Sequence, residues 1–203
     1  MGGSPPSTTG AGAMGGTGGT SGTGGAGGDV SIIDDFASCD GEISPIDGRD
    51  GGWFTFGDED MSVEPLNPVV DQAPPGGLFD ESACSAWYTA ACAEPGIYCD
   101  FAGLGFTFFD DESAYDLSGY QGFSIRKEGP EQWIVVHMGD ELTFGATLPS
   151  TLGTHAVYFY NFVPSGETSS SAVPDWSQVT KVEFTAVTPG SSSELAIYDI
   201  RLL

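Results

Sequence analysis

The chain has 203 residues, a length that suits one domain of ordinary size. Its 29 Asp and Glu outnumber 5 Lys and Arg, which gives a formal net charge of −24. So few cations cannot neutralise a run of phosphates, and an anionic membrane surface would repel the chain, so nucleic acid and such membranes are excluded as partners. The sequence has no run of about 18 apolar residues, and we expect no membrane-spanning segment.

Residues 1–29 differ in composition from the rest of the chain. They hold 13 of the 31 glycines and carry no charged side chain before Asp29. Such a segment buries too little apolar surface to offset the entropy lost on ordering. We therefore predict a disordered Gly/Thr/Ser-rich tether over 1–29, followed by one domain over 30–203.

The start of the chain lacks the basic and then apolar run of a signal peptide. The low-complexity segment nevertheless resembles those that follow a cleaved leader or a lipidated cysteine. Our hypothesis is that a leader is encoded upstream of Met1, and that the tether displays the domain outside the cell or at its surface.

The chain has four cysteines, which are Cys39, Cys84, Cys92 and Cys99. Their spacing does not fit zinc, and neither His137 nor His155 lies near them in sequence. An even number in an acidic, lysine-poor chain predicts two disulfides and an oxidising compartment. The spacing does not choose among the three pairings, although Cys92 with Cys99 would close the shortest loop. Four reduced, buried cysteines are the alternative.

After residue 29, short β-rich segments alternate with turn residues. We expect strands at 30–36 and 53–56, with a turn-rich loop at 40–52. Residues 57–80 are rich in Pro, Gly and acids and predict a long loop of the kind that often carries function. Residues 82–93 have some helical promise and are equally a loop pinned by a disulfide.

From residue 98 the expected strands come at regular intervals. They are 99–109, 122–127, 132–138, 142–146, 155–162, 179–187 and 194–202. Eight or nine short strands without helical periodicity predict an all-β fold, a sandwich or jelly roll of two antiparallel sheets.

Four segments in order carry a resemblance to a known group of domains. They are IIDDFASCDGEISPIDGRDGGWFTF (32–56), AGLGFTFF (102–109), AYDLSGYQGFSIRKEG (114–129) and the ending VTKVEFTAV…ELAIYDIRLL (179–203). Together they resemble carbohydrate-binding-module-like domains of the galactose-binding-like jelly-roll type, as found in bacterial secreted proteins and lipoproteins. The resemblance implies a galactose-binding-like jelly-roll β-sandwich and extracellular, non-catalytic carbohydrate binding.

The resemblance also implies a structural Ca²⁺ between the first and last strands. The matching carboxylates are Asp34, Asp35 and Asp199, and Tyr198 stands where relatives often have a further acid. Pairing of the terminal strands would bring Asp35 and Asp199 together, and two like charges favour a bound cation. The alternative is that one acid faces solvent and the other caps a turn.

Arg49 lies among acids in the turn Asp47-Gly48-Arg49-Asp50-Gly51. We expect a structural ion pair with Asp47, Asp50 or a distant carboxylate.

Sugar recognition needs aromatic faces for C–H surfaces and polar side chains for hydroxyls. The candidates are Trp53, Trp87, Tyr88, Trp133, Tyr158 and Tyr160. Alternation in HAVYFYNF (155–162) places Tyr158 and Tyr160 on one face, which we predict to bind the ligand. Trp87 and Tyr88 are further ligand candidates because they lie in a cysteine-rich segment, whereas we expect Trp53 and Trp133 in the core.

The sequence has no G-x-S-x-G elbow, HExxH helix motif or phosphate-binding loop, so we do not expect an enzyme. The predicted function is an extracellular carbohydrate-binding module with a polysaccharide or glycan as its partner and a monomeric state. The alternatives are a structural or adhesive surface module without sugar binding and an accessory domain of a larger secreted enzyme.

Overall fold

The computed structural model describes residues 29–57, 61–64, 84–92, 101–139, 142–186 and 192–203. The predicted tether therefore lies almost wholly outside the described residues, as does most of the predicted loop at 57–80.

Twelve strands and two short 3-10 helices make up the described fold. The strands are β1 (Ile32–Asp34), β2 (Trp53–Gly57), β3 (Met61–Glu64), β4 (Ala86–Cys92), β5 (Ala102–Thr107), β6 (Gly122–Glu128), β7 (Gln132–Met138), β8 (Leu142–Leu148), β9 (Gly153–Tyr158), β10 (Val163–Pro164), β11 (Val179–Ala186) and β12 (Ser192–Leu202). The 3-10 helices are η1 (Ile46–Gly48) and η2 (Phe159–Asn161). Neither of these helices, in the part of the chain that the structure describes, is long enough to cross a membrane.

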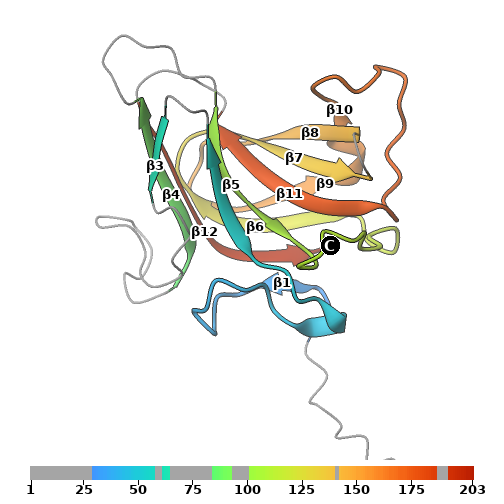
Figure 1. The fold of residues 1–203 in the computed structure, drawn as a ribbon, viewed down its shortest axis with the longest axis horizontal. Coiled ribbons are helices and arrows are strands. Elements are labelled where there is room, and N and C mark those ends of the chain that lie inside the picture. Colours follow the sequence, from blue (N-terminus) through green and yellow to red (C-terminus); the bar gives the residue numbers. More distant parts are fainter. Residues whose placement is uncertain (1–28, 58–60, 65–83, 93–100, 140–141, 187–191) are drawn as a thin grey trace, which may run out of the picture.

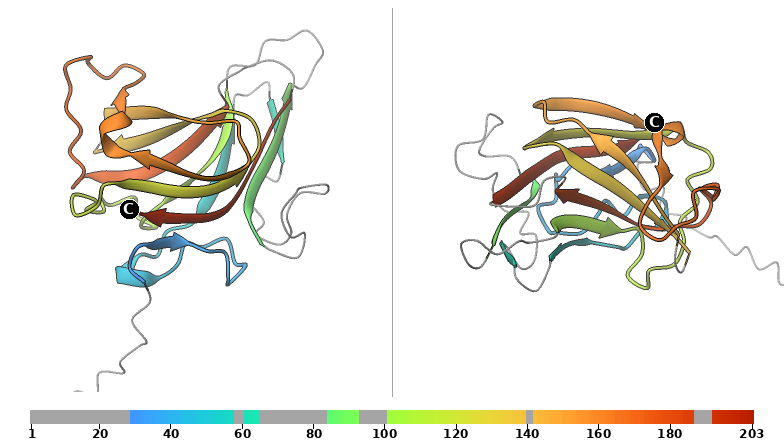
Figure 2. Two further views of the ribbon diagram at one scale, coloured as in Figure 1. Left: turned by 180° about the vertical axis from the view of Figure 1, so that it is seen from behind. Right: turned by 90° about the horizontal axis from the view of Figure 1, so that it is seen from above.

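The strands form two antiparallel sheets that face each other (Figures 1 and 2). The β12 sheet has the order β3-β4-β12-β6-β9, and β1 also pairs with β12. The β11 sheet has the order β10-β8-β7-β11-β5-β2. The prediction of an all-β sandwich of two antiparallel sheets is thus confirmed, and so is the pairing of the first strand with the last, in which Asp34 lies opposite Ile200.

Alternation along the strands builds the core between the two sheets. On β7, Gln132, Ile134, Val136 and Met138 are buried, while the residues between them are only partly buried. The inward residues of β5, β6, β11 and β12 are fully buried as well, among them Leu104, Ile125, Phe184 and Ile197. A strand such as β7 therefore buries one face and leaves the other for the surface, whereas β5 is buried on both faces over Ala102–Phe106.

The prediction of a helix or loop over 82–93 is wrong, because residues 86–92 form β4. This strand pairs with β3 on one side and β12 on the other. Ala86, Tyr88 and Ala90 are buried in alternation. Alanine has little strand preference of its own, and pairing on both sides overrides that preference. The loop predicted for 57–80 is likewise interrupted by β3.

Cys39 and Cys84 form a disulfide with their Cα atoms 5.7 Å apart. It joins the loop after β1 to the residues just before β4. The prediction of a disulfide is confirmed for this pair. Cys99 and the side chain of Cys92 lie outside the described residues, so a second bridge stays a prediction.

Candidate functional site

The outer face of the β11 sheet carries four aromatic side chains, which we call the aromatic face. They are Phe54 and Phe56 on β2, Phe101 just before β5 and Trp133 on β7. Ring centroids of Phe54 and Phe56 are 6.1 Å apart, and those of Phe56 and Phe101 are 6.3 Å apart. The three phenylalanines therefore form a row along one edge of the sheet, and Trp133 lies across from them.

Strand register sets what lies between the two sides of the aromatic face. Phe56 is opposite Gly103, Gly103 is opposite Thr185, and Thr185 is opposite Trp133. Three strand spacings separate Phe56 from Trp133, or roughly 14 Å. The next row holds Phe54, Gly105, Glu183 and Val135 in the same order. Two aromatic borders thus enclose a strip of small and polar residues.

Glycines let the aromatic rings lie directly over the sheet backbone. A Cβ at Gly103 would come within 2.6 Å of Cζ of Phe56, and one at Gly105 within 2.8 Å of Cζ of Phe54. A Cβ at Gly145 on β8 would overlap the indole of Trp133. Any side chain at these positions would displace the rings, so the buried glycines let the rings lie against the sheet.

Glu183 lies at the centre of the strip and contacts His137 and Lys181, which face each other in the next register row. Its Oε2 accepts a hydrogen bond from Nε2 of His137 at 2.7 Å, and its Oε1 lies 2.8 Å from Nζ of Lys181. Burial raises the pKa of Glu183, but the hydrogen bonds and charges of His137 and Lys181 outweigh burial and hold it below its ordinary value. Glu183 is therefore an ionised acceptor flanked by donors, a combination that suits hydroxyl groups.

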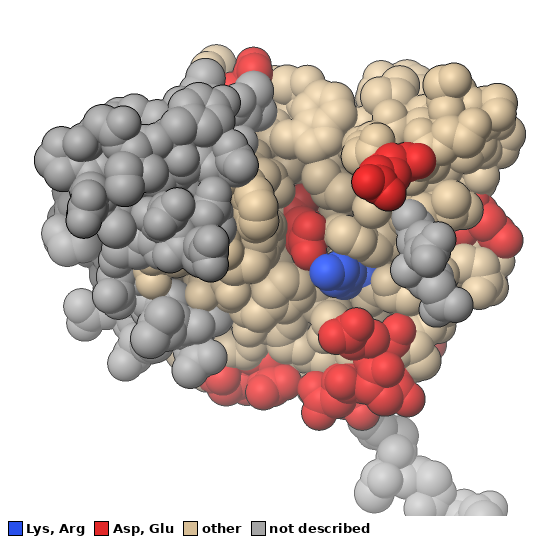
Figure 3. Space-filling view, turned by 45° about the horizontal axis from the view of Figure 1, so that its top comes forward, with Lys and Arg blue, Asp and Glu red and all other residues tan. Residues whose placement is uncertain are grey.

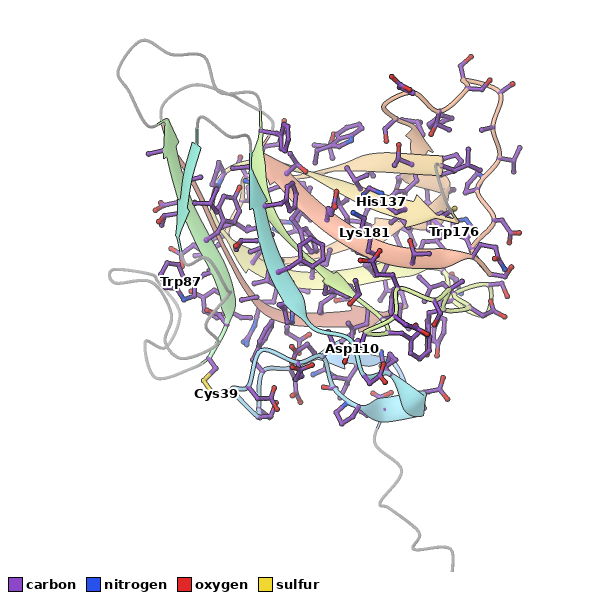
Figure 4. All side chains as sticks on the ribbon, viewed as in Figure 1. Cys39, Trp87, Asp110, His137, Trp176 and Lys181 are labelled. Carbon is purple, nitrogen blue, oxygen red and sulfur yellow. A yellow bond between two sulfur atoms is a disulfide. The ribbon has the colours of Figure 1, made fainter. Side chains whose placement is uncertain are left out.

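A hollow of about 440 Å³ opens at the His137 end of this strip. Its lining residues are Asp111, Glu112, His137, Gly139, Thr180 and Lys181. Figure 3 shows basic surface on this face with acidic surface close to it, and Figure 4 places His137 and Lys181 on neighbouring strands. Polar groups for ligand hydroxyls thus adjoin the aromatic rings.

The predicted tyrosine face is present, although the chain leaves strand geometry within it. The strand ends at Tyr158 and η2 follows, yet the rings of Tyr158 and Tyr160 stack with centroids 5.3 Å apart and planes 6° apart. Tyr160 is 79% exposed and Tyr158 36%, whereas Val157 and Phe159 are buried. The structure therefore brings together Tyr158 and Tyr160 at the surface.

The other two predicted sugar-binding residues lie apart from this pair. Tyr88 is wrong as a surface residue, because it is fully buried and its hydroxyl lies 3.2 Å from Oε1 of Gln132. Trp87 packs on Ala196 and Tyr198, on a part of the molecule away from His137 and Lys181 (Figure 4). Strand register places Trp87 level with Glu128 and Tyr158 level with Gly122, at the two ends of β6 and three strands apart, which separates them by roughly 25 Å.

The carboxylates predicted to hold Ca²⁺ are engaged elsewhere. Asp34 accepts hydrogen bonds from Nε1 of Trp53 and the backbone N of Phe36, both at 2.7 Å. Asp199 makes a two-oxygen contact with Arg201, with Nε 2.9 Å from Oδ1. The exposed Asp35 caps its own turn at the backbone N of Ala37.

These contacts do not fit a shared calcium site, and no group of three or more potential ligands that could hold a metal ion occurs among the described residues. The cation that Asp199 meets is Arg201. Calcium binding stays a prediction, and a fall in Tm on adding EGTA would support it.

The expected carboxylate partner of Arg49 is replaced by backbone oxygens. Arg49 is 1% exposed, and its guanidinium donates to the carbonyls of Ile46 at 2.7 Å and Ile32 at 2.5 Å. Asp47 instead accepts a hydrogen bond from the hydroxyl of Tyr115 at 2.8 Å. Arg49 therefore ties the turn of η1 to β1, a structural role.

Sequence reasoning missed most of the aromatic face. Trp53 is buried as expected. Trp133 was also expected in the core, but it lies on the outer face of the sheet. The signal was present in QWIVVHM (132–138), since Trp133 shares its parity with His137 and not with Ile134. Likewise, Phe54 directly follows the buried Trp53, so strand alternation places Phe54 on the outer face.

Two comparisons found nothing: no protein-family model matches the sequence, and no curated protein matches it. Among solved structures, the chain is similar to the family 11 carbohydrate-binding module from Clostridium thermocellum in complex with a β-1,3-1,4-mixed-linked tetrasaccharide. The identity is 13%, the match covers 85% of this chain and 94% of that one, and the TM-score is 0.59.

A second similar structure is the family 11 carbohydrate-binding module of a cellulosomal cellulase of the same organism. It is 14% identical, with 74% of this chain and 86% of that one covered and a TM-score of 0.55. At such identities the likeness shows the fold, which is the jelly-roll β-sandwich of these modules. The fold class that the sequence motifs implied is confirmed.

Proposed function

We propose that this domain is a non-catalytic carbohydrate-binding module that holds a polysaccharide chain across the aromatic face. The observation that carries the proposal is the register row in which Phe56 and Trp133 border Gly103 and Thr185. Aromatic rings pack against the C–H faces of sugars, and rings on both sides of a strip can grip one extended chain.

The polar groups of the strip supply the remaining contacts in this proposal. Glu183 accepts hydrogen bonds from sugar hydroxyls, while His137 and Lys181 donate to ring or hydroxyl oxygens. Their mutual contacts of 2.7 and 2.8 Å hold them in place before the ligand arrives, so little side-chain freedom is lost on binding.

The first ligand to test is a mixed-linked β-glucan, because one structurally similar module is in complex with a β-1,3-1,4-linked tetrasaccharide. An extracellular setting is part of the proposal, supported by the Cys39–Cys84 disulfide. We also propose that the domain is an accessory domain of a larger secreted enzyme. The second similar structure supports this proposal, because it is a module of a cellulase.

Electrophoresis in gels that contain a soluble polysaccharide tests the proposal. We expect mixed-linked β-glucan or another neutral polysaccharide to retard the protein, and Trp133→Ala to lose most of the retardation. Val173→Ala is the matched control, since Val173 is 81% exposed and lies on neither β2 nor β7. Unretarded migration through every neutral polysaccharide would leave the structural or adhesive module as the better explanation.

A further inference from the structure

A second aromatic surface belongs to the other sheet of the sandwich. Tyr158 ends β9 at the edge of the β12 sheet, and its neighbour Val157 points into the core, so Tyr158 points outward. The ring of Tyr160 stacks on it at 5.3 Å, with most of its own surface in solvent. The two stacked rings form one continuous exposed aromatic surface, and contiguous apolar surface of this kind can mark an interaction site.

The tyrosine pair stands on a rigid support. Phe159, between the two tyrosines, is buried and stacks on Trp176 with ring centroids 3.8 Å apart and planes 7° apart. Its backbone N donates to the carbonyl of Gln121 at 2.8 Å. Because this residue anchors η2 in the core, the exposed rings keep their position without a ligand, which lowers the entropy cost of binding one.

A hollow of about 540 Å³ lies beside the pair. Val157 and Asn161, the residues directly before and after the segment 158–160, both line it, and its polar lining includes Thr147, Thr154 and His155. The hollow lies where β8 and β9, from the two different sheets, come together. It combines hydroxyl, amide and imidazole groups and has no Lys or Arg in its lining.

We propose that the tyrosine pair and this hollow form a second carbohydrate site. A neutral pyranose stacks on the ring of Tyr160, and the hydroxyl groups of the sugar bind in the hollow. This inference rests on the proposed function, because it assigns the same class of ligand to a different surface. The tyrosine pair lies on the β12 sheet and the aromatic face on the β11 sheet, and the two sites meet at the hollow, where Thr147 is the strand neighbour of Trp133. As two distinct sites they would let one protein molecule hold two polysaccharide chains.

Amide chemical shifts of the full chain test the second site independently of the first. The probes are tetrasaccharides of mixed-linked β-glucan, cellulose and xylan, titrated into the wild type, Trp133→Ala and Tyr160→Ala. We expect shifts at residues 158–161 to persist in Trp133→Ala. In Tyr160→Ala we expect about tenfold weaker binding there, with the shifts of Val135 and Glu183 unchanged.

Light scattering of a soluble mixed-linked β-glucan gives a second readout. A protein with two sites cross-links chains, so scattering should rise with the wild type and with Tyr160→Phe, which keeps the ring. Trp133→Ala and Tyr160→Ala should each abolish the rise, because either change leaves one site.

Two outcomes would overturn the inference, and only one of them would also overturn the proposed function. Shifts on the aromatic face with none at residues 158–161 would show that only the first site exists, and the proposed function would stand. If none of the tetrasaccharides moves any amide, the second site and the proposed function both fall.

Discussion

The position of Trp133 depends on a residue that has no side chain. The indole occupies the space over Gly145 where a Cβ would lie. Gly145→Ala should push the ring off the sheet and weaken polysaccharide binding about tenfold, the effect of losing one good aromatic contact. Gel retardation on mixed-linked β-glucan measures the change.

The matched control for this variant is Gly119→Ala, where an added Cβ meets nothing within 4 Å. We expect Gly119→Ala to bind as the wild type does. Urea unfolding of both variants should stay close to the wild type, since the ring that moves lies outside the core. Unchanged retardation of Gly145→Ala would show that Trp133 does not contact the ligand.

Asp34 makes stability depend on pH in an unusual direction. Burial raises its pKa from 3.8 to about 6, against the opposing hydrogen bonds from Trp53 and Phe36. Between these two values the folded state keeps the proton and the unfolded state loses it. The free energy of unfolding from this group therefore falls as pH rises through the window, by about 3 kcal/mol in total.

Asp34→Asn removes this titration and should remove the corresponding loss of stability. The difference between wild type and variant should shift by about 2 kcal/mol in favour of the variant between pH 4 and pH 7. Urea unfolding across this range measures it, and Glu167→Gln, at an exposed acid outside the contacts of Asp34, is the control. A parallel pair of pH profiles for wild type and Asp34→Asn would contradict the burial argument.

Among the elements, β1 and β4 are joined by the Cys39–Cys84 disulfide, whose cysteines are 45 residues apart in sequence. A cross-link that closes a loop of this length removes unfolded-state entropy worth about 4 kcal/mol. The double variant Cys39→Ser/Cys84→Ser should lose stability on that order in urea unfolding. The same unfolding free energy with and without the bridge would mean that the loop is already held in the unfolded state.

Pattern predicted the strands well where one face of each strand is buried and the other is not. QWIVVHM (132–138) became β7 with the bounds expected, because its inward residues alternate without interruption. Residues 86–92 include three alanines, which have little strand preference, and what makes the segment a strand is pairing with β3 and β12. That pairing partner is distant in sequence, so local preference could not find it.

The candidate site was harder to predict for a related reason. The aromatic face consists of side chains from β2, from the residue before β5 and from β7, which share a surface only through strand register. Tyr88 and Trp133 were assigned to the wrong sides because the sequence gives the alternation within a strand but not which parity faces the core. Tyr158 and Tyr160 were found together because their spacing is local.

For the whole molecule, net charge decides which polysaccharides can approach. The formal charge is −24, and Lys181, the cation on the aromatic face, already contacts Glu183 at 2.8 Å. An anionic polysaccharide is therefore repelled, while a neutral one experiences no such force. We expect retardation by mixed-linked β-glucan but none by polygalacturonate at low ionic strength.

Varying the salt concentration distinguishes the long-range repulsion by the net negative charge from the short-range contacts in the binding site. Raising ionic strength from about 0.01 M to about 1 M shortens the screening length from about 30 Å to about 3 Å. Retardation by the neutral glucan should stay constant over this range, because stacking and neutral hydrogen bonds are barely screened. The Tm should rise over the same range as repulsion among the carboxylates weakens. The contrary outcome is that polygalacturonate retards the protein at low salt and that Lys181→Gln removes this retardation. Lys181 would then be available to an acidic ligand, and the predicted preference for neutral chains would be wrong.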